Sequence, residues 1–351
     1  MASDTVQLSE EELAYYSRQI VLKELGLKGQ EALKRAKVCV VGLGGLGSPV
    51  SIQLASMGVG HLRIVDRDVV EMSNLQRQHL YGVDVVGYPK VEAAEIRLKR
   101  LNPFIEVEPV PMSITPENAE KIIAGSDLVV DCLDSMSPRY ALNRACVKLG
   151  IPLLFGAVIT HVGNATTIIP GETPCLECFM GNVDDSSMPT CAVVGVHPSI
   201  IGIIASIQAS EAIRILTGKP PILAGNLIFC DLEGLTFETI KLAEVENCPV
   251  CGSSPRSPPP PIHHDSMQEI CGREARRVYV YTPDEEEAID LDVKAELLIS
   301  QGYTIQTKTR LGATFTKGNL RGSILKSGVT ILEGVKDMDE AVRLRGTLME
   351  T

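Results

Sequence analysis

The stretch KVCVVGLGGLG, residues 37–47, restricts the fold more than any other part of this sequence. A run rich in β-branched residues ends in a cluster of glycines, and a helical pattern, SPVSIQLASMG, follows at once. Glycines at such a turn let the backbone approach a ligand closely, and the helix directs free amides and a partial positive charge at a phosphate. The stretch therefore predicts a strand, a phosphate-binding turn and a helix. The glycines of the turn are Gly42, Gly44, Gly45 and Gly47.

Strand-like and helix-like segments continue to alternate along the chain. The strand-like segments are 61–68, 105–112, 127–134 and 151–158, and helix-like segments lie at 116–125 and 138–150. This alternation predicts right-handed crossovers and a doubly wound, mostly parallel, Rossmann-like α/β sheet. Residues 226–242 are expected to add antiparallel strands at the far side of that sheet.

Residues 198–218 are apolar enough to be compared with a membrane span. Gln208, Glu211 and Arg214 interrupt the run, which leaves it short of the roughly 20 apolar residues that a spanning helix needs. We therefore expect a helix that is buried in the core or at a subunit interface.

Charge and cysteine content narrow the choice of partners and compartment. A net charge of -11 argues against a nucleic acid or an anionic membrane as partner, because such partners select for basic surfaces. The start of the chain lacks the basic and apolar regions of a secretory signal, so we expect a cytoplasmic protein. There the ten cysteines are better explained as core, metal-binding or catalytic thiols than as disulfides.

Composition predicts two domains joined by a linker. Residues 253–271 open with SSPRSPPPPIHHDS, and proline density of this kind is typical of an extended, semi-rigid spacer. Residues 1–252 would contain the sheet, and residues 272–351 a small α+β domain whose size suits the recruitment of a partner protein. Within that domain, strands are expected at 276–283, 304–310 and 327–334 and helices at 285–302 and 337–349.

A polar loop, DRDVVEMSNLQRQ, follows the second strand at residues 66–78. Asp66 stands where an acidic residue binds ribose hydroxyls, and Asp68 follows it closely. A nicotinamide dehydrogenase would share the glycine turn and Asp66, so these two features indicate a nucleotide without saying which one. Further groups suited to phosphoryl oxygens favour a triphosphate over a dinucleotide. They are Asn74, Arg77, Gln78 and Lys90.

Asp134 ends the strand-like segment DLVVDCLD, 127–134. The carboxyl edge of a parallel sheet is where open α/β folds bind ligands, so Asp134 is expected near the same nucleotide. Since magnesium prefers oxygen ligands, a carboxylate beside a triphosphate is well placed to hold it.

Two CxxC pairs, Cys175 with Cys178 and Cys248 with Cys251, supply the four thiolates of a closed zinc site. Their long separation in sequence leaves a redox CxxC or unpaired core thiols open as alternatives. Cys191 lies outside both pairs, in MPTCAVVGVHPS, and is expected to be an exposed loop thiol. It is a candidate nucleophile, and the alternative is a loop cysteine without a catalytic role.

The motifs SRQI, GLGGLGSP, DRDVVEMSNLQRQ, VGYPK, LNP and DCLD follow one another in this order. With them, residues 9–252 resemble the ubiquitin-activating enzymes and their bacterial-type relatives, the molybdopterin-synthase and thiazole-biosynthesis adenylyltransferases. The resemblance implies that the nucleotide is ATP. It further implies that the enzyme adenylates the C-terminal glycine of a small β-grasp protein ending in Gly-Gly.

The resemblance also implies roles for single residues. Asp66 would bind the ribose, Asp134 would hold magnesium, and the four paired cysteines would hold a structural zinc ion. The phosphate-binding residues would be Asn74, Arg77, Gln78 and Lys90. Arg18 matches an arginine that reaches the γ-phosphate from a neighbouring subunit, which implies a homodimer with shared sites. One position departs from the pattern, because Ser135 stands where the family commonly has asparagine.

Cys191 matches the cysteine that, in the activating enzymes, takes the substrate as a thioester. The leading hypothesis is therefore adenylation of a ubiquitin-like protein, thioester formation on Cys191 and transfer to a conjugating enzyme. The main alternative is an adenylyltransferase for a sulfur carrier in molybdopterin, thiamine or tRNA thiolation pathways, without an obligatory thioester. A nicotinamide oxidoreductase and a non-catalytic scaffold are the alternatives from other classes.

Overall fold

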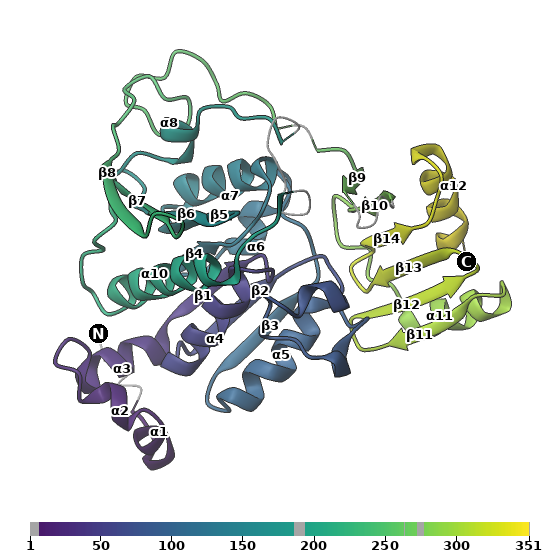
Figure 1. Ribbon diagram of the computed structural model, residues 1–351, viewed down its shortest axis with the longest axis horizontal. Coiled ribbons are helices and arrows are strands. Elements are labelled where there is room, and N and C mark those ends of the chain that lie inside the picture. The colour runs from purple at the N-terminus through teal and green to yellow at the C-terminus, as the bar shows by residue number, and fades with distance from the viewer. Residues whose placement is uncertain (1–6, 186–193, 263, 272–276, 351) are drawn as a thin grey trace.

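The computed structural model describes residues 7–185, 194–262, 264–271 and 277–350, which form two β-sheets, each with its own helices (Figure 1). The larger sheet has eight strands in the order β3-β2-β1-β4-β5-β6-β7-β8. Its strands are β1 (Lys37–Val41), β2 (His61–Val65), β3 (Glu106–Val110), β4 (Leu128–Asp131), β5 (Leu153–Ile159), β6 (Val162–Ile168), β7 (Asn226–Asp231) and β8 (Thr236–Lys241). The first five pair in parallel, and β6, β7 and β8 pair antiparallel at the far side, which confirms the predicted α/β sheet.

Helices cover both faces of the larger sheet. One face is covered by α3 (Gly26–Arg35), α4 (Gly47–Met57), α5 (Lys90–Leu101) and α10 (Pro198–Leu216), and the other by α6 (Ala119–Ile123), α7 (Met136–Leu149) and α8 (Leu176–Met180). Strand β1 shows the reason: Val38 and Val40 are buried in one core, and the alternating Cys39 and Val41 in the other. The described residues also form the short helices α1 (Glu10–Tyr15), α2 (Ser17–Ile20), η1 (Met72–Asn74) and η2 (Val83–Val85).

Helix α10 is long and apolar enough to cross a membrane, with a mean hydropathy of 1.5 over its most apolar window. It packs on α4 and on the sheet instead, and its polar residues have partners there. Gln208 donates to the Asp131 carbonyl at 2.9 Å, and Glu211 accepts from the Leu223 amide at 2.8 Å. The expectation of a helix buried in the core is confirmed.

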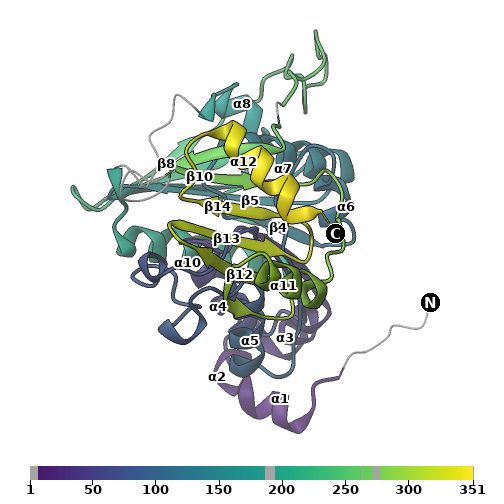
Figure 2. The same ribbon diagram turned by 90° about the vertical axis from the view of Figure 1, so that its right-hand side faces the viewer.

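Residues 267–350, called the C-terminal region below, contain the second sheet, whose strand order is β11-β12-β13-β14-β10-β9. All of its strands pair antiparallel. They are β9 (Met267–Cys271), β10 (Arg277–Tyr281), β11 (Thr304–Lys308), β12 (Gly312–Lys317), β13 (Leu320–Leu325) and β14 (Thr330–Glu333). Helices α11 (Leu291–Ser300) and α12 (Met338–Met349) cover the face turned away from the larger sheet (Figure 2).

Three expectations for the C-terminal region differ from the structure. Residues 267–271, assigned to the linker, form β9, because they pair with β10 along its whole length. The helix expected from residue 285 begins at Leu291, since the Asp290 carboxylate caps it by accepting from the Val293 amide at 3.1 Å. Strands β12 and β13 were not expected. Their sequences contain glycine, and a Cβ at Gly322 would lie 2.4 Å from the Phe315 ring of the next strand.

Candidate functional site: a nucleotide edge and a cysteine cluster

The strand order places the predicted nucleotide residues at one edge of the larger sheet. The chain runs from β1 outward to β2 and β3, then returns to the other side of β1 as β4. Ligands of open α/β sheets bind at such a reversal, outside the carboxyl ends of the strands. The glycine turn follows β1, and Asp134 follows β4. The reversal thus lies between them.

The glycine turn is a backbone cradle that side chains would fill. Gly42 has a φ of +89°, and a Cβ there would lie 2.7 Å from the Cys132 carbonyl oxygen. A Cβ at Gly47, where α4 begins, would lie 1.8 Å from the Gly42 carbonyl oxygen. The buried Tyr81 hydroxyl donates to the Leu43 carbonyl at 3.0 Å and holds the turn from outside. Sequence reasoning did not identify Tyr81, because no local pattern links it to the turn.

Asp66 joins the glycine turn to the end of β2. Its Oδ2 accepts from the Leu43 amide at 2.6 Å, and its Oδ1 accepts from the Asp68 amide at 2.8 Å. Burial raises the pKa of Asp66, although the nearby Lys90 ammonium opposes the shift. The carboxylate is therefore fixed in orientation beside the cradle, where the sequence predicted a ribose ligand.

Lys90 and Asp68 form an ion pair next to Asp66, with Nζ 2.8 Å from Oδ2. The Lys90 side chain is 6% exposed and that of Asp68 is 40% exposed. Burial by itself lowers the pKa of Lys90, but the carboxylates of Asp68 and Asp66, with a smaller effect of Asp134, outweigh it and raise the pKa. Lys90 is thus a buried lysine at the nucleotide edge whose charged form the neighbouring carboxylates favour.

Asn74, Arg77 and Gln78 lie on η1 and the turn after it. The Asn74 Oδ1 accepts from the Glu71 amide at 3.0 Å, and the Arg77 Nη1 donates to the Ser73 carbonyl at 3.0 Å. Gln78 is 3% exposed, and its Oε1 has no hydrogen-bond partner among the described residues. Gln78 Nε2 lies 3.9 Å from the place where a Cβ on Gly44 would stand, so this side chain borders the cradle.

Asp134 is exposed just beyond β4, and Ser135 occupies the N-cap position of α7 without a side-chain hydrogen bond. Asp185 caps α7 instead: its carboxylate accepts from the Met136 amide and from the Ser137 amide at 3.0 Å, and from the Ser137 hydroxyl at 2.7 Å. A carboxylate at a helix N-terminus is favoured by the dipole. Sequence reasoning missed this cap, because Asp185 is 49 residues from Met136.

Arg139 is a third residue that the sequence did not reveal. It is 5% exposed, and its guanidinium donates to the Leu133 carbonyl and, at 2.8 Å, to the Gly156 carbonyl. Its Nε lies 3.5 Å from the fully buried Asp131 carboxylate. Arg139 therefore fixes the backbone directly before Asp134. In the sequence it looks like an ordinary solvated charge on a helix.

Arg18, the residue expected to serve a neighbouring subunit, is exposed on α2. Within the described part of the chain, no side-chain hydrogen bond or ion pair joins Arg18 to the other predicted site residues. This position agrees with the expectation that Arg18 acts on another copy, which stays a prediction.

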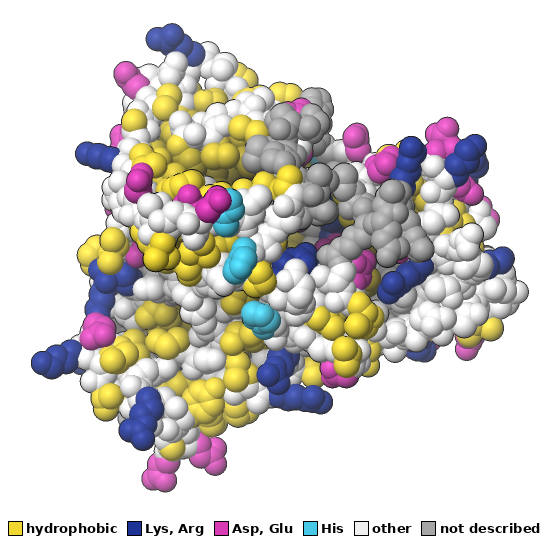
Figure 3. All heavy atoms as spheres, in the orientation of Figure 1, with side chains coloured by type: hydrophobic (Ala, Val, Ile, Leu, Met, Phe, Trp, Pro, Cys, Tyr) yellow, Lys and Arg dark blue, Asp and Glu magenta, His cyan; other side chains and the backbone are white. Residues whose placement is uncertain are grey.

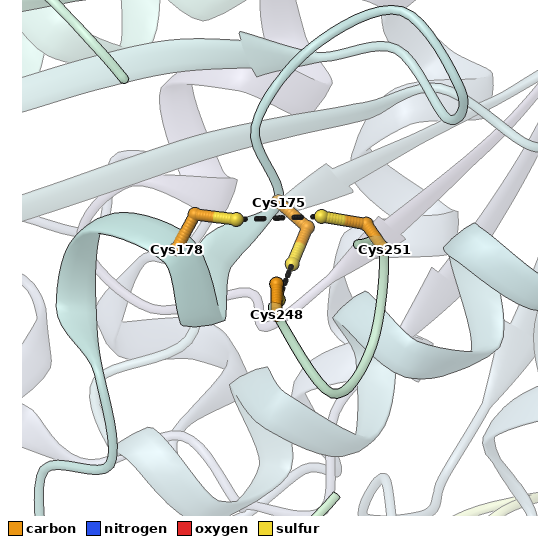
Figure 4. Close-up of side chains that lie close together, drawn as sticks. All are labelled: Cys175, Cys178, Cys248 and Cys251. Atoms are coloured by element: carbon orange, nitrogen blue, oxygen red, sulfur yellow. Dashed lines mark hydrogen bonds between the residues drawn. The ribbon is translucent and has the colours of Figure 1, made fainter. Parts of the chain in front are cut away.

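The four cysteines of the two CxxC pairs meet in space (Figure 4). Their sulfur atoms all lie within 4.8 Å of one another, with Cys175 and Cys248 3.7 Å apart and Cys178 and Cys251 3.3 Å apart. These separations are too long for disulfides, whose sulfurs are about 2.05 Å apart. They suit the edges of a tetrahedron around zinc, which at Zn–S bonds of about 2.3 Å are roughly 3.8 Å long.

The cluster has the chemistry of a structural metal centre. Burial raises the pKa of Cys175, and it raises the pKa of Cys251 to about 12. A bound cation would stabilise the thiolates that burial disfavours. All four corners are protein sulfurs, which leaves no open position for a substrate. Cys191, the candidate nucleophile, lies outside the described residues.

Comparison with known proteins identifies the group to which this architecture belongs. A sequence profile of the ThiF family matches residues 16–250. The chain belongs to the ThiF family. The match includes the larger sheet, the nucleotide edge and three of the four clustered cysteines, and it ends one residue before Cys251 and before the C-terminal region of this ThiF-family protein.

Individual relatives of this ThiF-family protein agree with that assignment. The chain is 43% identical over 249 residues to the SAMP-activating enzyme E1 of Haloferax volcanii, a match covering 71% of this chain and 92% of the relative. It is 42% identical over 253 residues to the sulfur carrier protein adenylyltransferase of Thermus thermophilus, with 70% and 93% covered. The protein is thus an enzyme of the activating, adenylyltransferase type.

Among solved structures, the fold is similar to that of MccB from E. coli crystallised with ATP. The TM-score is 0.62 at 25% sequence identity, and the similarity covers 70% of this chain and 76% of MccB. The likeness supports the α/β architecture described above.

Proposed function

We propose that this protein uses ATP to adenylate the C-terminal glycine of a small ubiquitin-like carrier protein of the β-grasp fold. The observation that carries the proposal is the buried Lys90 ammonium, held by Asp68 and Asp66 beside the glycine cradle. A nicotinamide cofactor needs the cradle and Asp66, but it does not need a buried cation at this position. A triphosphate does need such a cation, because its negative charge must be neutralised.

The reaction is attack on phosphorus by a carboxylate. An oxygen of the glycine carboxylate forms a bond to the α-phosphorus of ATP, and the bond from that phosphorus to the bridging oxygen of the β-phosphate breaks. Pyrophosphate leaves with the electron pair, and the carrier ends in a mixed anhydride with AMP. Lys90 and Arg77 would stabilise the charge on the leaving pyrophosphate, and Asp66 would orient the ribose.

Asp134 is the carboxylate available for magnesium, and its exposed position just beyond β4 leaves it accessible to a solvated cation. Bound magnesium would neutralise phosphate charge. Zinc in the cluster of Cys175, Cys178, Cys248 and Cys251 would be structural, joining α8 and its N-cap to residues 248–251.

The surface at the far side of the larger sheet suits a protein substrate. Apolar side chains gather over β6, β7 and β8 in the space-filling view (Figure 3). Leu235 is 73% exposed, Phe237 51% and Ile240 48%. Clusters of exposed apolar residues are typical of protein-protein contact sites, and a free small-molecule acid would make no use of one here.

Adenylation needs no protein nucleophile, so the function proposed above does not depend on Cys191. Sulfur-carrier activation, as the name of the Thermus relative describes for that protein, agrees with this chemistry. Thioester formation on Cys191, transfer to a conjugating enzyme and a homodimer sharing Arg18 remain predictions that require their own tests.

The function is tested by ATP:pyrophosphate exchange with magnesium and a β-grasp protein ending in Gly-Gly from the same organism. We expect exchange that depends on the carrier, is lost in Arg77→Ala and Asp134→Ala, and is retained in Cys191→Ala. Binding of ATP and NAD, compared by calorimetry, gives an independent check. Exchange that survives both Arg77→Ala and Asp134→Ala would defeat the site assignment, and preferential binding of NAD would defeat the proposed function.

A further inference from the structure

The loop between β2 and α5 folds into a small two-stranded ribbon, residues 68–70 with 87–90. The Lys90 amide donates to the Asp68 carbonyl at 2.9 Å, the Val70 amide to the Tyr88 carbonyl at 2.8 Å and the Gly87 amide to the Val70 carbonyl at 2.9 Å. One end of this ribbon carries the Lys90–Asp68 ion pair. The position of the ribbon therefore sets the position of two nucleotide-site side chains.

The C-terminal region packs on the ribbon. Val69 is buried in one apolar cluster with Val280, Leu325 and Val329 of the second sheet. This cluster lies on the sheet face that α11 and α12 do not cover. Figures 1 and 2 show the second sheet between those helices and the larger sheet. The ribbon thus packs on the apolar face of the second sheet that α11 and α12 leave uncovered.

The contact is close enough to require glycine on both sides. Gly87 has a φ of +90°, and a Cβ there would lie 2.9 Å from the Thr307 hydroxyl. A Cβ on Gly312 would lie 2.7 Å from the Pro89 ring. The Thr314 hydroxyl donates to the Gly87 carbonyl at 2.9 Å. The backbone of each side meets side chains of the other here, so the ribbon has little freedom to shift.

Glu92 connects the helix of Lys90 to the C-terminal region. It lies in the first turn of α5, two residues after Lys90, and is 7% exposed. Its two carboxylate oxygens accept from the Arg310 amide at 3.1 Å and the Leu311 amide at 2.9 Å. A carboxylate that receives two backbone amides in a buried place fixes the geometry of both partners.

Contacts on the other side of Asp66 complete the arrangement. The Arg67 guanidinium donates to the Gln268 side-chain oxygen at 3.1 Å, and the hydroxyls of Ser113 and Thr282 are 3.1 Å apart. The C-terminal region therefore holds both the loop after β2 and the exit of β3. The family match ends at residue 250, so the partner residues lie beyond the part shared with the family.

We infer that the C-terminal region holds the nucleotide site in its binding geometry, and that Glu92 is a positioning residue. Glu92 would orient Lys90 and Asp68 through the first turn of α5. The inference rests on the proposed function, because it assumes ATP at this edge. It gives the C-terminal region a role in ATP binding, in addition to any recruitment of partners.

The test compares full-length variants by calorimetric titration with ATP and by thermal unfolding. Glu92→Ala is expected to raise the Kd for ATP about tenfold, and Glu92→Gln, which keeps one acceptor, to raise it less. Arg310→Ala removes the ion pair between the exposed guanidinium and Glu95 but keeps the Arg310 amide, so the Kd should stay unchanged. Leu348→Ala is the control for general destabilisation. It removes a buried side chain from the core under α12, so it should lower the Tm and leave the Kd for ATP unchanged.

A folded Glu92→Ala protein with the wild-type Kd for ATP would overturn the inference and leave the proposed function intact. A Kd that rises equally in Leu348→Ala would also overturn it, because general destabilisation would then explain the effect. If Glu92→Ala does not fold, Thr314→Val takes its place, and its Kd for ATP is expected to rise several-fold. An unchanged Kd in Thr314→Val would likewise overturn the inference. Wild-type protein that fails to bind ATP would instead defeat the proposed function.

Discussion

Lys90 Nζ lies 2.8 Å from Asp68 Oδ2 in a pair whose lysine is buried and whose aspartate is partly open to solvent. The asymmetry matters for a charged ligand. A phosphate approaching from the open side meets an ammonium that is already oriented and desolvated, so little reorganisation is needed when charge develops on the leaving group. The pair is thus a preorganised anion receptor that also stabilises the fold.

Removing the Lys90 ammonium should abolish most of the activity. Lys90→Met is expected to lower the rate of carrier-dependent ATP:pyrophosphate exchange by about 100-fold or more, because a buried positive charge beside the phosphates is lost. Lys99→Met is the matched control, since Lys99 lies on the same helix but is 50% exposed and forms an ion pair with Glu95. Equal rates for Lys90→Met and wild type would contradict the role given to Lys90.

The ion pair predicts a pH dependence of stability. The pKa of Asp68 is lowered, although burial opposes the shift, because Lys90 and Arg67 stabilise its charged form. A lowered folded-state pKa contributes stability above the unfolded-state value and loses it as the pH falls through the folded-state value. Wild type should therefore exceed Asp68→Asn in free energy of unfolding near neutral pH, and the difference should shrink below about pH 4.

The expected difference is modest. Because the Asp68 side chain is 40% exposed, solvent screens the pair, and about 1 kcal/mol is the scale at neutral pH. Urea unfolding of both proteins at several pH values measures it. A difference that grows as the pH falls would show that the sign of the linkage is wrong.

The cysteine cluster predicts one zinc ion per chain. Metal analysis of wild-type protein should give about one equivalent, and Cys175→Ser should give much less together with a lower Tm, since structural zinc contributes folding energy directly. Cys39→Ala is the control for zinc content, because Cys39 is a buried thiol of β1 that is not one of the four clustered cysteines. Protein that keeps its Tm after complete metal removal would argue against a structural metal centre.

The capping of α7 by Asp185 predicts that changing this residue lowers the stability of the protein, although Asp185 lies far from α7 in sequence. Asp185→Ala removes the carboxylate that accepts from the first amides of α7 and should lower the free energy of unfolding by about 1 kcal/mol. Asp185→Asn keeps an acceptor but loses the charge at the helix N-terminus, so a smaller loss is expected. Unfolding curves of the three proteins decide the matter, and three superimposed curves would exclude a capping role.

Local chemistry explains which parts of the site could be read from the sequence. The turn from Gly42 to Gly47 was predictable, because the need for glycine arises within a few residues. The use of the two cysteine pairs as metal ligands was also predictable, because CxxC spacing lets two thiolates bind one metal ion. The prediction was possible even though the two pairs are 73 residues apart. The alternation of strands and helices likewise fixed the parallel sheet.

Long-range contacts explain what the sequence did not reveal. Nothing in the sequence around Glu92 indicates that it receives the amides of Arg310 and Leu311, more than 200 residues away. The buried Arg139 and the capping Asp185 are hidden for the same reason. Strand β9 was mistaken for linker because a proline-rich stretch precedes it, and only pairing with β10 defines it as a strand.

The central claim is that ATP and a β-grasp carrier meet at the edge of the sheet that carries Lys90. Its most direct test is intact-mass spectrometry of the carrier from the same organism after incubation with the enzyme, magnesium ATP and pyrophosphatase. We predict a carrier that gains one adenylyl group, and no gain in a carrier lacking its last glycine or with the Lys90→Met enzyme. An unmodified carrier in the presence of folded, zinc-loaded wild-type enzyme would contradict the account.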